Sequence, residues 1–358
     1  MKVLALRVLA WDVTARLPQR IDFIKGRISK SVDYSEIYIS PIHTFGYYLG
    51  YIISFILTIP RLLRRNYDIL LIENAYLVVF GIISRLSGKK VIAEYVDYYP
   101  DMLHRIYHTR KFRYFVAFML CSMFSKLANF VIVETQLSKQ IVISLGIPSK
   151  KIRVISQSPD LSVIKRQDRH EIRRKYGITD DEFVIGYLGK FPDHYGLELI
   201  PAATASAQKQ TKRNLVLLMV GDGEFLSKIE EMTNENGYRA IFPGRVPFQE
   251  VSKYYSSFDV LIYTPNTASG IKLAEALVLG VPVIVGAGYA TEFIKDGYNG
   301  FVAEPRAVEA YAKKIIEVES RTEEDLQNLS ERIRHYAHKR FVLSHNQYLI
   351  MFNEVIKN

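Results

Sequence analysis

The stretch SGIKLAEALVLGVPVIVG, residues 269–286, decides the fold because it combines a helix with the buried strand that follows it. Gly270 stands before the helical part, and the triplet Gly280, Val281 and Pro282 ends it. The run that follows is apolar and β-branched, which is typical of a strand buried on both faces of a parallel sheet. The stretch therefore predicts one helix-to-strand step of an α/β domain.

The rest of the chain repeats this alternation of short apolar runs and helical stretches. In the second half the runs are FVIGYLG, LVLLMVG, RAIFPG, DVLIYTP and VPVIVG, and in the first half they are VLALRVLA, EIYIS, DILLIENA, KKVIAEYV and NFVIVET. Short apolar runs separated by helices indicate a parallel sheet with crossover helices. We therefore predict an α/β protein with two Rossmann-like, doubly wound domains that face a cleft.

The polar stretch after Ile155 predicts the linker between the two domains. We place the N-terminal domain at residues 1–161 and the C-terminal domain at residues 162–335. Residues 336–358 have apolar positions at helical spacing, and we expect them to form a helix that completes the N-terminal domain. A chain of 358 residues is long enough for two such domains.

The basic charge is confined to one half of the sequence. Residues 1–165 hold 23 Lys and Arg against 11 Asp and Glu, whereas residues 166–358 hold 24 against 26. A basic half that is rich in aromatic residues indicates an anionic partner. Because the basic residues alternate with long apolar helices and form no stripe, we expect a membrane surface and no nucleic acid.

Two apolar segments in this half, residues 45–60 and 112–124, suggest contact with lipid. The first has 16 residues, fewer than the ~20 that a spanning helix needs, and Arg61, Arg64 and Arg65 follow it. It fits a buried crossover helix, an interfacial helix with its arginines on headgroups, or a span. From the two segments together we expect peripheral attachment to an anionic membrane surface.

The cysteine content bears on the cellular compartment. Cys121 is the one cysteine, which excludes an intramolecular disulfide and a cysteine-based zinc site. The N-terminal run MKVLALRVLAWDV carries Arg7 and has no small-residue cleavage site, so it predicts a core strand and no signal peptide. We therefore expect a reducing, cytoplasmic location, with no metal site and no cofactor.

The start of the helix in residues 269–286 offers a place for an anion. The N–H groups of Ile271, Lys272 and Leu273 have no partner within the helix, so they form an anion site behind Gly270. Glu275 lies one turn further, where its carboxylate is able to accept hydrogen bonds from a pair of ribose hydroxyls. Taken alone, this pattern also fits an ordinary α/β turn.

Several segments, in order, give the sequence a family resemblance. GRVPFQEVSKYYSSFDVLIYTP, SGIKLAEALVLGVPVIVG and EFIKDGYNGFV, with GYLGKFPDHYGLELI and LLMVGDGE upstream, resemble the C-terminal half of retaining, nucleotide-sugar-dependent glycosyltransferases of family 4, which have the GT-B fold. The resemblance runs from about Phe183 to Phe301. It extends more weakly over the first half, at AWDVTARLPQRI, AEYVDYYPDM and RVISQSPDLS.

The resemblance implies where a donor nucleotide sugar binds. Glu275 matches the glutamate that holds the ribose, and Lys190 stands where an arginine neutralises the diphosphate. Arg245 and Val246 lie where the backbone reads the base edge. Lys190 is also a catalytic candidate, because it would stabilise the leaving diphosphate. The implied donor-binding positions are Gly189, Lys190, Arg245, Val246, Thr267, Gly270, Ile271, Lys272, Leu273 and Glu275.

The sequence departs from the family pattern at three positions. Thr267 occupies the place of the family's first glutamate, Tyr195 that of a second basic residue, and Val96 that of a histidine that touches the donor sugar. Asp97, beside Val96, is the second catalytic candidate. The acceptor-side candidates, which follow the first strand, are Trp11, Asp12 and Arg16.

The resemblance implies a retaining hexosyltransferase that moves a sugar from a nucleotide-diphosphate sugar to a lipid-linked or membrane-proximal glycan acceptor. Lys190 and the helix N-terminus would stabilise the leaving diphosphate without a metal, and the leaving phosphate would itself take the acceptor's proton. Because three polar positions are changed, a second reading stays open. It is a non-catalytic GT-B protein that binds a nucleotide sugar or partners another transferase.

Overall fold

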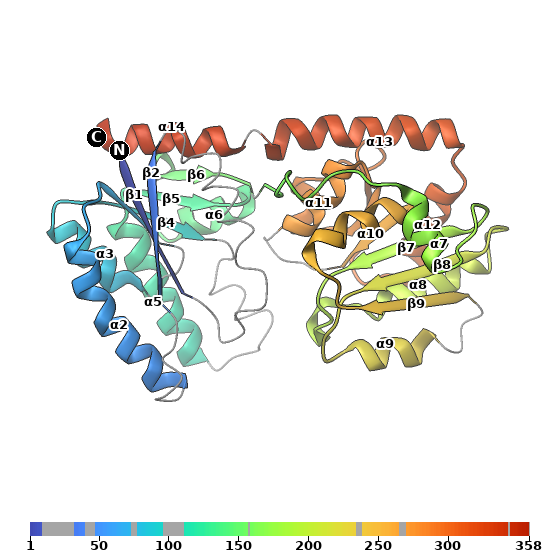
Figure 1. Cartoon of the computed structure of the whole chain (residues 1–358), viewed down its shortest axis with the longest axis horizontal. Coiled ribbons are helices and arrows are strands. Elements are labelled where there is room, and N and C mark those ends of the chain that lie inside the picture. Colours follow the sequence, from blue (N-terminus) through green and yellow to red (C-terminus); the bar gives the residue numbers. More distant parts are fainter. Residues whose placement is uncertain are drawn as a thin grey trace. The chain divides into compact units, whose positions relative to one another are not determined.

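Two units, each built on one six-stranded sheet, make up the structure, which is a computed structural model (Figure 1). Unit 1 comprises Met1–Ser158 and Leu343–Asn358, and unit 2 comprises Pro159–Val342. The residues that the structure describes are 1–8, 32–39, 47–72, 77–95, 111–156, 158–233, 238–264, 270–342 and 344–357.

The sheet of unit 1 is parallel throughout, with strand order β2-β1-β3-β4-β5-β6. Its strands are β1 (Lys2–Val8), β2 (Asp33–Ile39), β3 (Ile69–Ile72), β4 (Lys90–Tyr95), β5 (Phe130–Val133) and β6 (Ile152–Val154). Every residue of β3 and β5 is buried, as expected for continuous apolar runs in a sheet covered on both faces. The strand order reverses between β1 and β3, which makes this pair the topological switch point of unit 1.

Helices cover both faces of this sheet. Those on one face are α2 (Tyr47–Arg64), α3 (Val78–Leu86), α5 (Lys111–Leu127) and α6 (Gln136–Ser144). On the opposite face, α14 (Ser344–Lys357) buries Tyr348 and Phe352. There Tyr348 Oη donates a hydrogen bond to Glu94 Oε1 at 2.5 Å. The C-terminal segment is therefore part of the core of unit 1.

The sheet of unit 2 has strand order β12-β11-β10-β7-β8-β9 and is also parallel. Its strands are β7 (Phe183–Leu188), β8 (Leu215–Val220), β9 (Arg239–Gly244), β10 (Val260–Tyr263), β11 (Val283–Gly286) and β12 (Phe301–Ala303). Its helices are α7 (Arg169–Lys175), α8 (Leu199–Gln208), α9 (Leu226–Thr233), α10 (Val251–Ser257), α11 (Ile271–Leu279), α12 (Val308–Glu319) and α13 (Glu323–Ala337). Two doubly wound parallel sheets are the fold class that the alternating runs predicted.

The ends of the two units differ in detail from the ranges expected from the sequence. The polar stretch after Ile155 contains α7, which packs on α10 within unit 2, so much of it is domain rather than linker. Near the C-terminus, the helical pattern from 336 onward belongs to two helices. α13 ends at Ala337, a π-helical turn covers His338–Val342, and α14 starts at Ser344.

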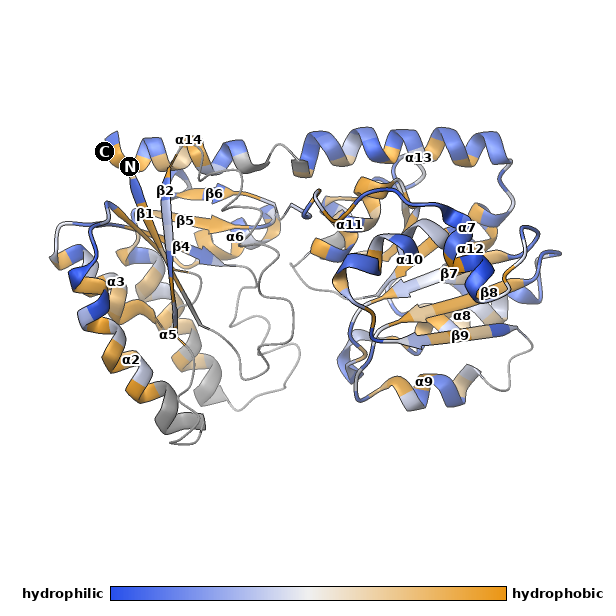
Figure 2. Ribbon diagram, in the orientation of Figure 1, coloured by the Kyte–Doolittle hydropathy of each residue, from blue (hydrophilic) through white to orange (hydrophobic). Residues whose placement is uncertain are grey.

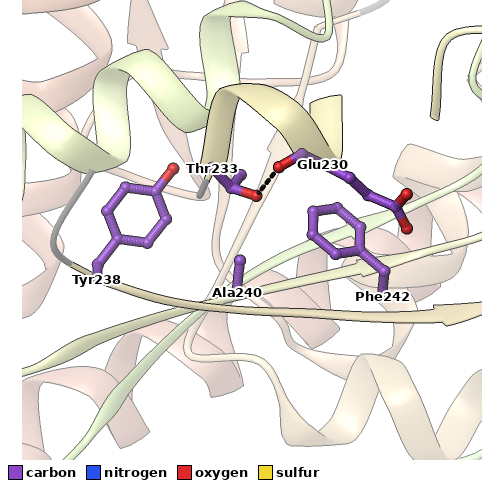
Figure 3. A pocket seen from close by; sticks show the side chains of 5 residues that line it. All are labelled: Glu230, Thr233, Tyr238, Ala240 and Phe242. Atoms are coloured by element: carbon purple, nitrogen blue, oxygen red, sulfur yellow. Dashed lines mark hydrogen bonds between the residues drawn. The ribbon is translucent and has the colours of Figure 1, made fainter. Parts of the chain in front are cut away.

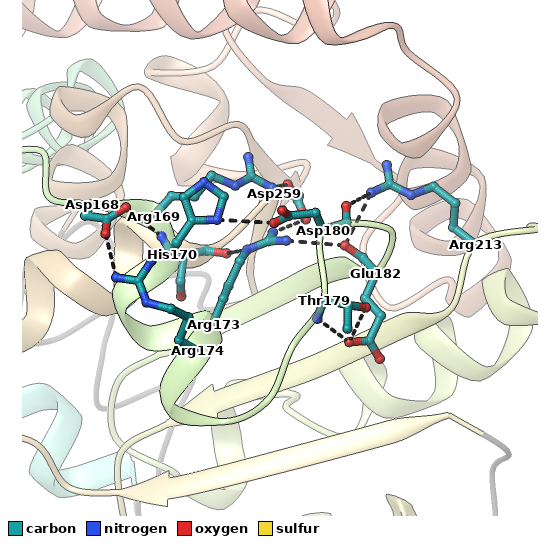
Figure 4. A network of polar contacts seen from close by, with 11 residues as sticks. Asp168, Arg169, His170, Arg173, Arg174, Thr179, Asp180, Glu182, Arg213 and Asp259 are labelled. Carbon is teal, nitrogen blue, oxygen red and sulfur yellow. Dashed lines mark hydrogen bonds and ion pairs between the residues drawn. The ribbon is translucent and has the colours of Figure 1, made fainter.

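A buried ion pair fastens α7 to the sheet of unit 2 (Figure 4). The side chain of Arg173 is 1% exposed, and its Nη2 lies 2.6 Å from Asp259 Oδ2. The same carboxylate oxygen accepts a hydrogen bond from the N–H of Val184 at 2.7 Å. Burial lowers the pKa of Arg173, and the charge of Asp259 opposes that shift. Asp259 therefore joins α7 to the amino ends of β7 and β10.

Replacing Asp259 with alanine is expected to lower the free energy of unfolding of unit 2 by about 3–5 kcal/mol, because the buried guanidinium of Arg173 loses its partner. Denaturant unfolding followed by circular dichroism measures this change. Asp168 provides the comparison, since its ion pair with Arg174 is exposed and Asp168→Ala should lose only the roughly 0.5–2 kcal/mol of the N-cap that its side chain gives to α7. Equal losses for the two variants would contradict this role of Asp259.

Candidate functional site

The carboxyl ends of β7 and β10 lie side by side in unit 2. The two strands are paired neighbours, with Leu261 opposite Gly186. β8 and β9 extend the sheet beyond β7, and β11 and β12 extend it beyond β10, so the strand order reverses at this pair. In open α/β sheets, ligands bind in the crevice outside the carboxyl ends of the strands at such a point. Lys190 follows β7, and the segment after β10 leads to Gly270.

Hydrogen bonds between backbones tie together the loops that follow β7, β8 and β9. The N–H of Gly189 donates to the carbonyl of Val220 at 2.9 Å, and that of Phe191 donates to Asp222 at 2.8 Å. The N–H of Gly221 in turn donates to the carbonyl of Gly244 at 2.9 Å. Lys190 and Arg245, both exposed, are thus carried on loops that are held to one another at the same edge of the sheet.

Two glycines make this close approach possible. Gly221 has a φ of 137°, and a Cβ there would lie 1.7 Å from the carbonyl oxygen of Gly189. Gly223 has a φ of 154°, and a Cβ there would lie 2.6 Å from the carbonyl oxygen of Phe191. The two glycines therefore let the loop after β8 pack directly on the backbone that carries Lys190.

Tyr187 holds the loop of Lys190 from inside the domain. Its Oη donates a hydrogen bond to the carbonyl oxygen of Lys190 at 2.5 Å, and its ring packs edge-on against Phe191 at 5.2 Å. Burial raises the pKa of Tyr187 well above its usual value, so the hydroxyl keeps its proton and donates. The backbone of Lys190 is fixed, while its side chain is exposed.

α11 presents its N-terminus at the same edge. Gly270 is its N-cap and has no side chain with which to accept a hydrogen bond from the first turn. The start of the helix therefore offers backbone N–H groups and the positive end of the helix dipole to an anion. A Cβ at Gly270 would lie 3.3 Å from the ring of Phe293, which is tight but not prohibitive.

Glu275 is a buried carboxylate with donors on one oxygen. It is 1% exposed, and its Oε2 accepts hydrogen bonds from Tyr255 Oη at 3.0 Å and from Lys272 Nζ at 3.1 Å. Within the described parts of the chain, no donor reaches its Oε1. The carboxylate is therefore oriented by two side chains and keeps one oxygen for a further hydrogen bond.

The structure brings together part of the site predicted from the sequence. Lys190, Arg245 and the start of α11 all lie at the carboxyl edge of the sheet of unit 2, and Glu275 lies one turn into α11. Val246 follows Arg245 and is half-buried, as is Tyr195. The predicted positions outside the described residues are Trp11, Asp12, Arg16, Val96, Asp97 and Thr267.

Sequence reasoning missed three residues of this site. Tyr187 and Tyr255 were unremarkable members of apolar stretches, yet one fixes the Lys190 loop and the other orients Glu275. Thr264 directly follows β10, and within the described structure its Oγ1 is buried without a hydrogen-bond partner. A polar residue at the carboxyl end of an apolar strand was the signal available for Thr264.

A surface cavity of about 490 Å³ lies elsewhere in unit 2, between α9 and the edge strand β9 (Figure 3). Its lining residues are Glu230, Thr233, Tyr238, Ala240 and Phe242. The hydroxyl of Thr233 donates to the carbonyl of Glu230 at 2.7 Å, and Tyr238 Oη donates to that of Pro201 at 3.1 Å. No residue of the predicted site lines it, so it is separate from the edge that carries Lys190.

The two parallel-sheet units place the protein in the GT-B class. The crystal structure of Anabaena HepE in complex with UDP and glucose matches it with a TM-score of 0.78. The match covers 99% of each chain at 19% sequence identity, so it shows the shared fold.

Family models match both halves of the chain. The model described as "Glycosyl transferases group 1" matches residues 168–340, and the model described as "Glycosyltransferase Family 4" matches residues 11–163. The chain therefore belongs to the GT-B glycosyltransferases of the family 4 and group 1 type.

Two curated relatives extend the comparison. An uncharacterized glycosyltransferase of Methanocaldococcus jannaschii is 27% identical over 51% of this chain and 48% of its own length. The N-acetyl-alpha-D-glucosaminyl L-malate synthase of Bacillus anthracis is 25% identical over 59% of this chain and 56% of its own length. The chain spans about half the length of the curated relatives it matches.

None of the helices within the described residues combines the length and the apolar composition that a membrane crossing requires. Likewise, no three His, Cys, Asp or Glu side chains in these ranges gather closely enough to hold a metal ion.

Proposed function

We propose that the protein transfers a sugar, with retention of anomeric configuration, from a nucleotide-diphosphate sugar to a lipid-linked or membrane-proximal glycan acceptor. The observation that carries the proposal is the group of anion-binding and hydroxyl-binding features at the switch point of unit 2. Lys190 on the loop after β7, the N-terminus of α11 and the buried Glu275 lie at one sheet edge. Membership of the glycosyltransferases fits this group of features.

Each part of a nucleotide-sugar donor has a partner in this proposal. The diphosphate lies on the first-turn N–H groups of α11 and beside the ammonium of Lys190. The ribose hydroxyls donate to the carboxylate of Glu275, whose Oε1 is left open by Tyr255 and Lys272. The base edge lies against the backbone at Arg245 and Val246, and the hydroxyl of Thr264 is a further contact.

The chemistry needs little from the protein beyond stabilising the departing diphosphate. The bond between the anomeric carbon and the phosphate oxygen breaks, and the acceptor hydroxyl attacks the same face of the sugar. Its proton passes to the departing phosphate oxygen, so no separate protein base is required. Lys190 and the N-terminus of α11 stabilise the negative charge that grows on that oxygen. We propose that no metal takes part.

The acceptor half of the proposal concerns unit 1. Trp11, Asp12 and Arg16 follow β1, which belongs to the switch-point pair of that unit, and we propose that they contact the acceptor. Asp97, which follows β4, is proposed to act near the transferred sugar. We further propose that the protein works in the cytoplasm, as a peripheral protein on the inner face of a membrane.

A second candidate function rests on the three altered positions. Thr267, Tyr195 and Val96 replace polar groups that the family pattern places around the donor. A non-catalytic protein that binds a nucleotide sugar, or partners another transferase, would tolerate these changes. Measuring turnover distinguishes the two functions, because a non-catalytic protein would bind the nucleotide sugar without transferring the sugar.

The proposed function is tested by ligand binding followed by transfer. Purified protein is screened against UDP-, GDP- and ADP-sugars for thermal stabilisation, where a ligand at 100 times its dissociation constant adds about 2.7 kcal/mol. The stabilising donor is then incubated with lipid-linked glycan acceptors, and NMR of the product reports the anomeric configuration. Binding without transfer would favour the non-catalytic function, and an inverted product would contradict retention.

Replacing Glu275 with alanine is expected to weaken nucleotide binding by about 1.5–3 kcal/mol, because charge-assisted hydrogen bonds to the ribose hydroxyls are lost. Isothermal titration with the nucleotide diphosphate measures the change. Glu275→Gln keeps an acceptor oxygen and should lose less nucleotide affinity. Tyr255→Phe removes one orienting hydrogen bond, so its nucleotide affinity should lie between those of the parent and Glu275→Ala. If Glu275→Ala binds the nucleotide as tightly as the parent, the ribose does not contact Glu275.

A further inference from the structure

We propose that the outward side of α2, α3 and α5 in unit 1 is a docking surface for an anionic lipid membrane. The purpose of this surface rests on the proposed function, because it would bring the protein to a lipid-linked acceptor. Lipid binding itself needs no transferase activity. Ten of the fourteen large hydrophobic side chains that are exposed in the described residues lie on these three helices. Such a concentration on one part of a protein marks a binding surface.

The apolar surface of α2 extends beyond the side that packs into unit 1. Its inward side packs Phe55 and Leu62 into the core of unit 1. Its outward side carries Ile52, Ile56 and Leu63, which follow at i, i+4 and i+11 and are 56%, 59% and 57% exposed. A helix on the surface of a sheet normally places polar residues at such exposed positions, so burial in unit 1 does not account for this stripe.

α5 and α3 continue the stripe of α2. On α5, Phe115, Met119 and Met123 follow at i, i+4 and i+8 and are exposed. On α3, Ile82 and Leu86 are exposed, the latter at 84%. Figure 2 shows apolar residues along all three helices. The docking surface is defined by these five side chains and by Ile52, Ile56 and Leu63 of α2.

The three helices pack as neighbours on one face of the sheet, which makes the surface continuous. α3 contacts both α2 and α5. The rings of Phe55 and Phe80 lie 4.3 Å apart and join α2 to α3. Gly81 of α3 approaches α5 so closely that a Cβ there would lie 3.0 Å from Leu127. Their outward sides therefore form one surface of unit 1.

Charge complementarity selects the occupant. α2, α3 and α5 contain no aspartate and no glutamate, whereas α13 of unit 2 has three acidic residues in its first turn alone. Arg61, Arg64 and Arg65 are exposed at the end of α2, and no ion pair holds them within the described ranges. Apolar side chains bordered by unpaired arginines fit acyl chains and anionic headgroups. A second copy of the surface would bring like charges together.

Vesicle flotation tests the surface, with phosphatidylcholine vesicles as the neutral probe and vesicles containing phosphatidylglycerol as the anionic one. The charge variant replaces Arg61, Arg64 and Arg65 with serine. Binding of the charge variant to anionic vesicles at low salt should fall roughly a hundredfold, since each surface arginine contributes about fivefold. Its control replaces the exposed Lys209, Lys212 and Lys313 of unit 2, and changes net charge equally.

The apolar variant replaces Ile56, Leu63 and Phe115 with serine, and its control replaces Ile350 and Ile356, which are exposed on α14. The parent should keep a salt-resistant fraction on anionic vesicles, which the apolar variant loses and its control retains. Equal flotation of the parent and both variants would contradict the proposed docking surface. So would a parent dimer that the apolar variant dissociates, because the surface would then bind a second copy.

Nucleotide binding separates this result from the proposed function. All variants should retain the nucleotide affinity and the thermal stability of the parent, because every replaced side chain is exposed. Vesicle binding that depends on the arginines, in a protein that binds no nucleotide, would refute the proposed function and keep the surface. If the protein binds the nucleotide but does not bind anionic vesicles, the proposed docking surface is refuted and the proposed function is not.

Discussion

Gly221→Ala is expected to lower the free energy of unfolding of unit 2 by about 3–5 kcal/mol and to abolish nucleotide binding. The new Cβ would lie 1.7 Å from the carbonyl oxygen of Gly189, so the backbone of one loop must move. The φ of 137° at Gly221 adds strain for any residue with a side chain. Because the Gly189 loop carries Lys190, its displacement also disturbs the candidate diphosphate site.

Gly297→Ala separates the clash from the backbone strain. Gly297 has a φ of 71°, but nothing lies within 4 Å of the position that its Cβ would take. Gly297→Ala should therefore lose only the roughly 1–2 kcal/mol of a left-handed residue and keep nucleotide binding. Denaturant unfolding and isothermal titration of both variants provide the comparison. Equal losses would mean that the contact between the two loops is unimportant.

The central strands were predictable because their pattern is local. Every residue of β7, β8 and β10 is buried, and each corresponds to an uninterrupted apolar run bounded by turn residues. The strand order does not follow from such runs, since it depends on which edges pair. β12 was not predicted, because its three residues, Phe301–Ala303, are too few to show a pattern.

The region after Ile155 shows how a distant partner can defeat a local prediction. Its polar composition predicted a linker, yet Arg173 lies in the core of unit 2 because Asp259 neutralises it there. The two residues are 86 positions apart in the sequence, so no window along the chain connects them. A charged residue in the core is recognisable only together with its partner.

The candidate site was predictable in outline and not in detail. A glycine before a helix and a glutamate one turn later predicted the start of α11 and the place of Glu275. The orientation of that carboxylate depends on Tyr255, which reaches it from α10. Side-chain contacts between helices follow from packing in three dimensions, whereas the position of a helix start follows from local chemistry.

Lys190→Ala is expected to lower kcat by about 10²–10³, because the ammonium would stabilise charge that develops as the diphosphate departs. Its KM for the donor should change much less, since the N-terminus of α11 and Glu275 hold the bound nucleotide in either variant. Initial rates of transfer, measured over a range of donor concentrations with a fixed acceptor, give both constants.

Two further variants show whether charge at this position is the cause. Lys190→Arg keeps the charge on the fixed loop and should recover most of the rate, whereas Lys212→Ala removes an exposed lysine of unit 2 and should change nothing. Tyr187 holds the backbone of Lys190, so Lys190→Ala should leave the loop in place and the unfolding transition unchanged. A kcat within threefold of the parent would assign leaving-group stabilisation to the helix N-terminus alone. In that event the exposed ammonium of Lys190 would have no part in the chemistry.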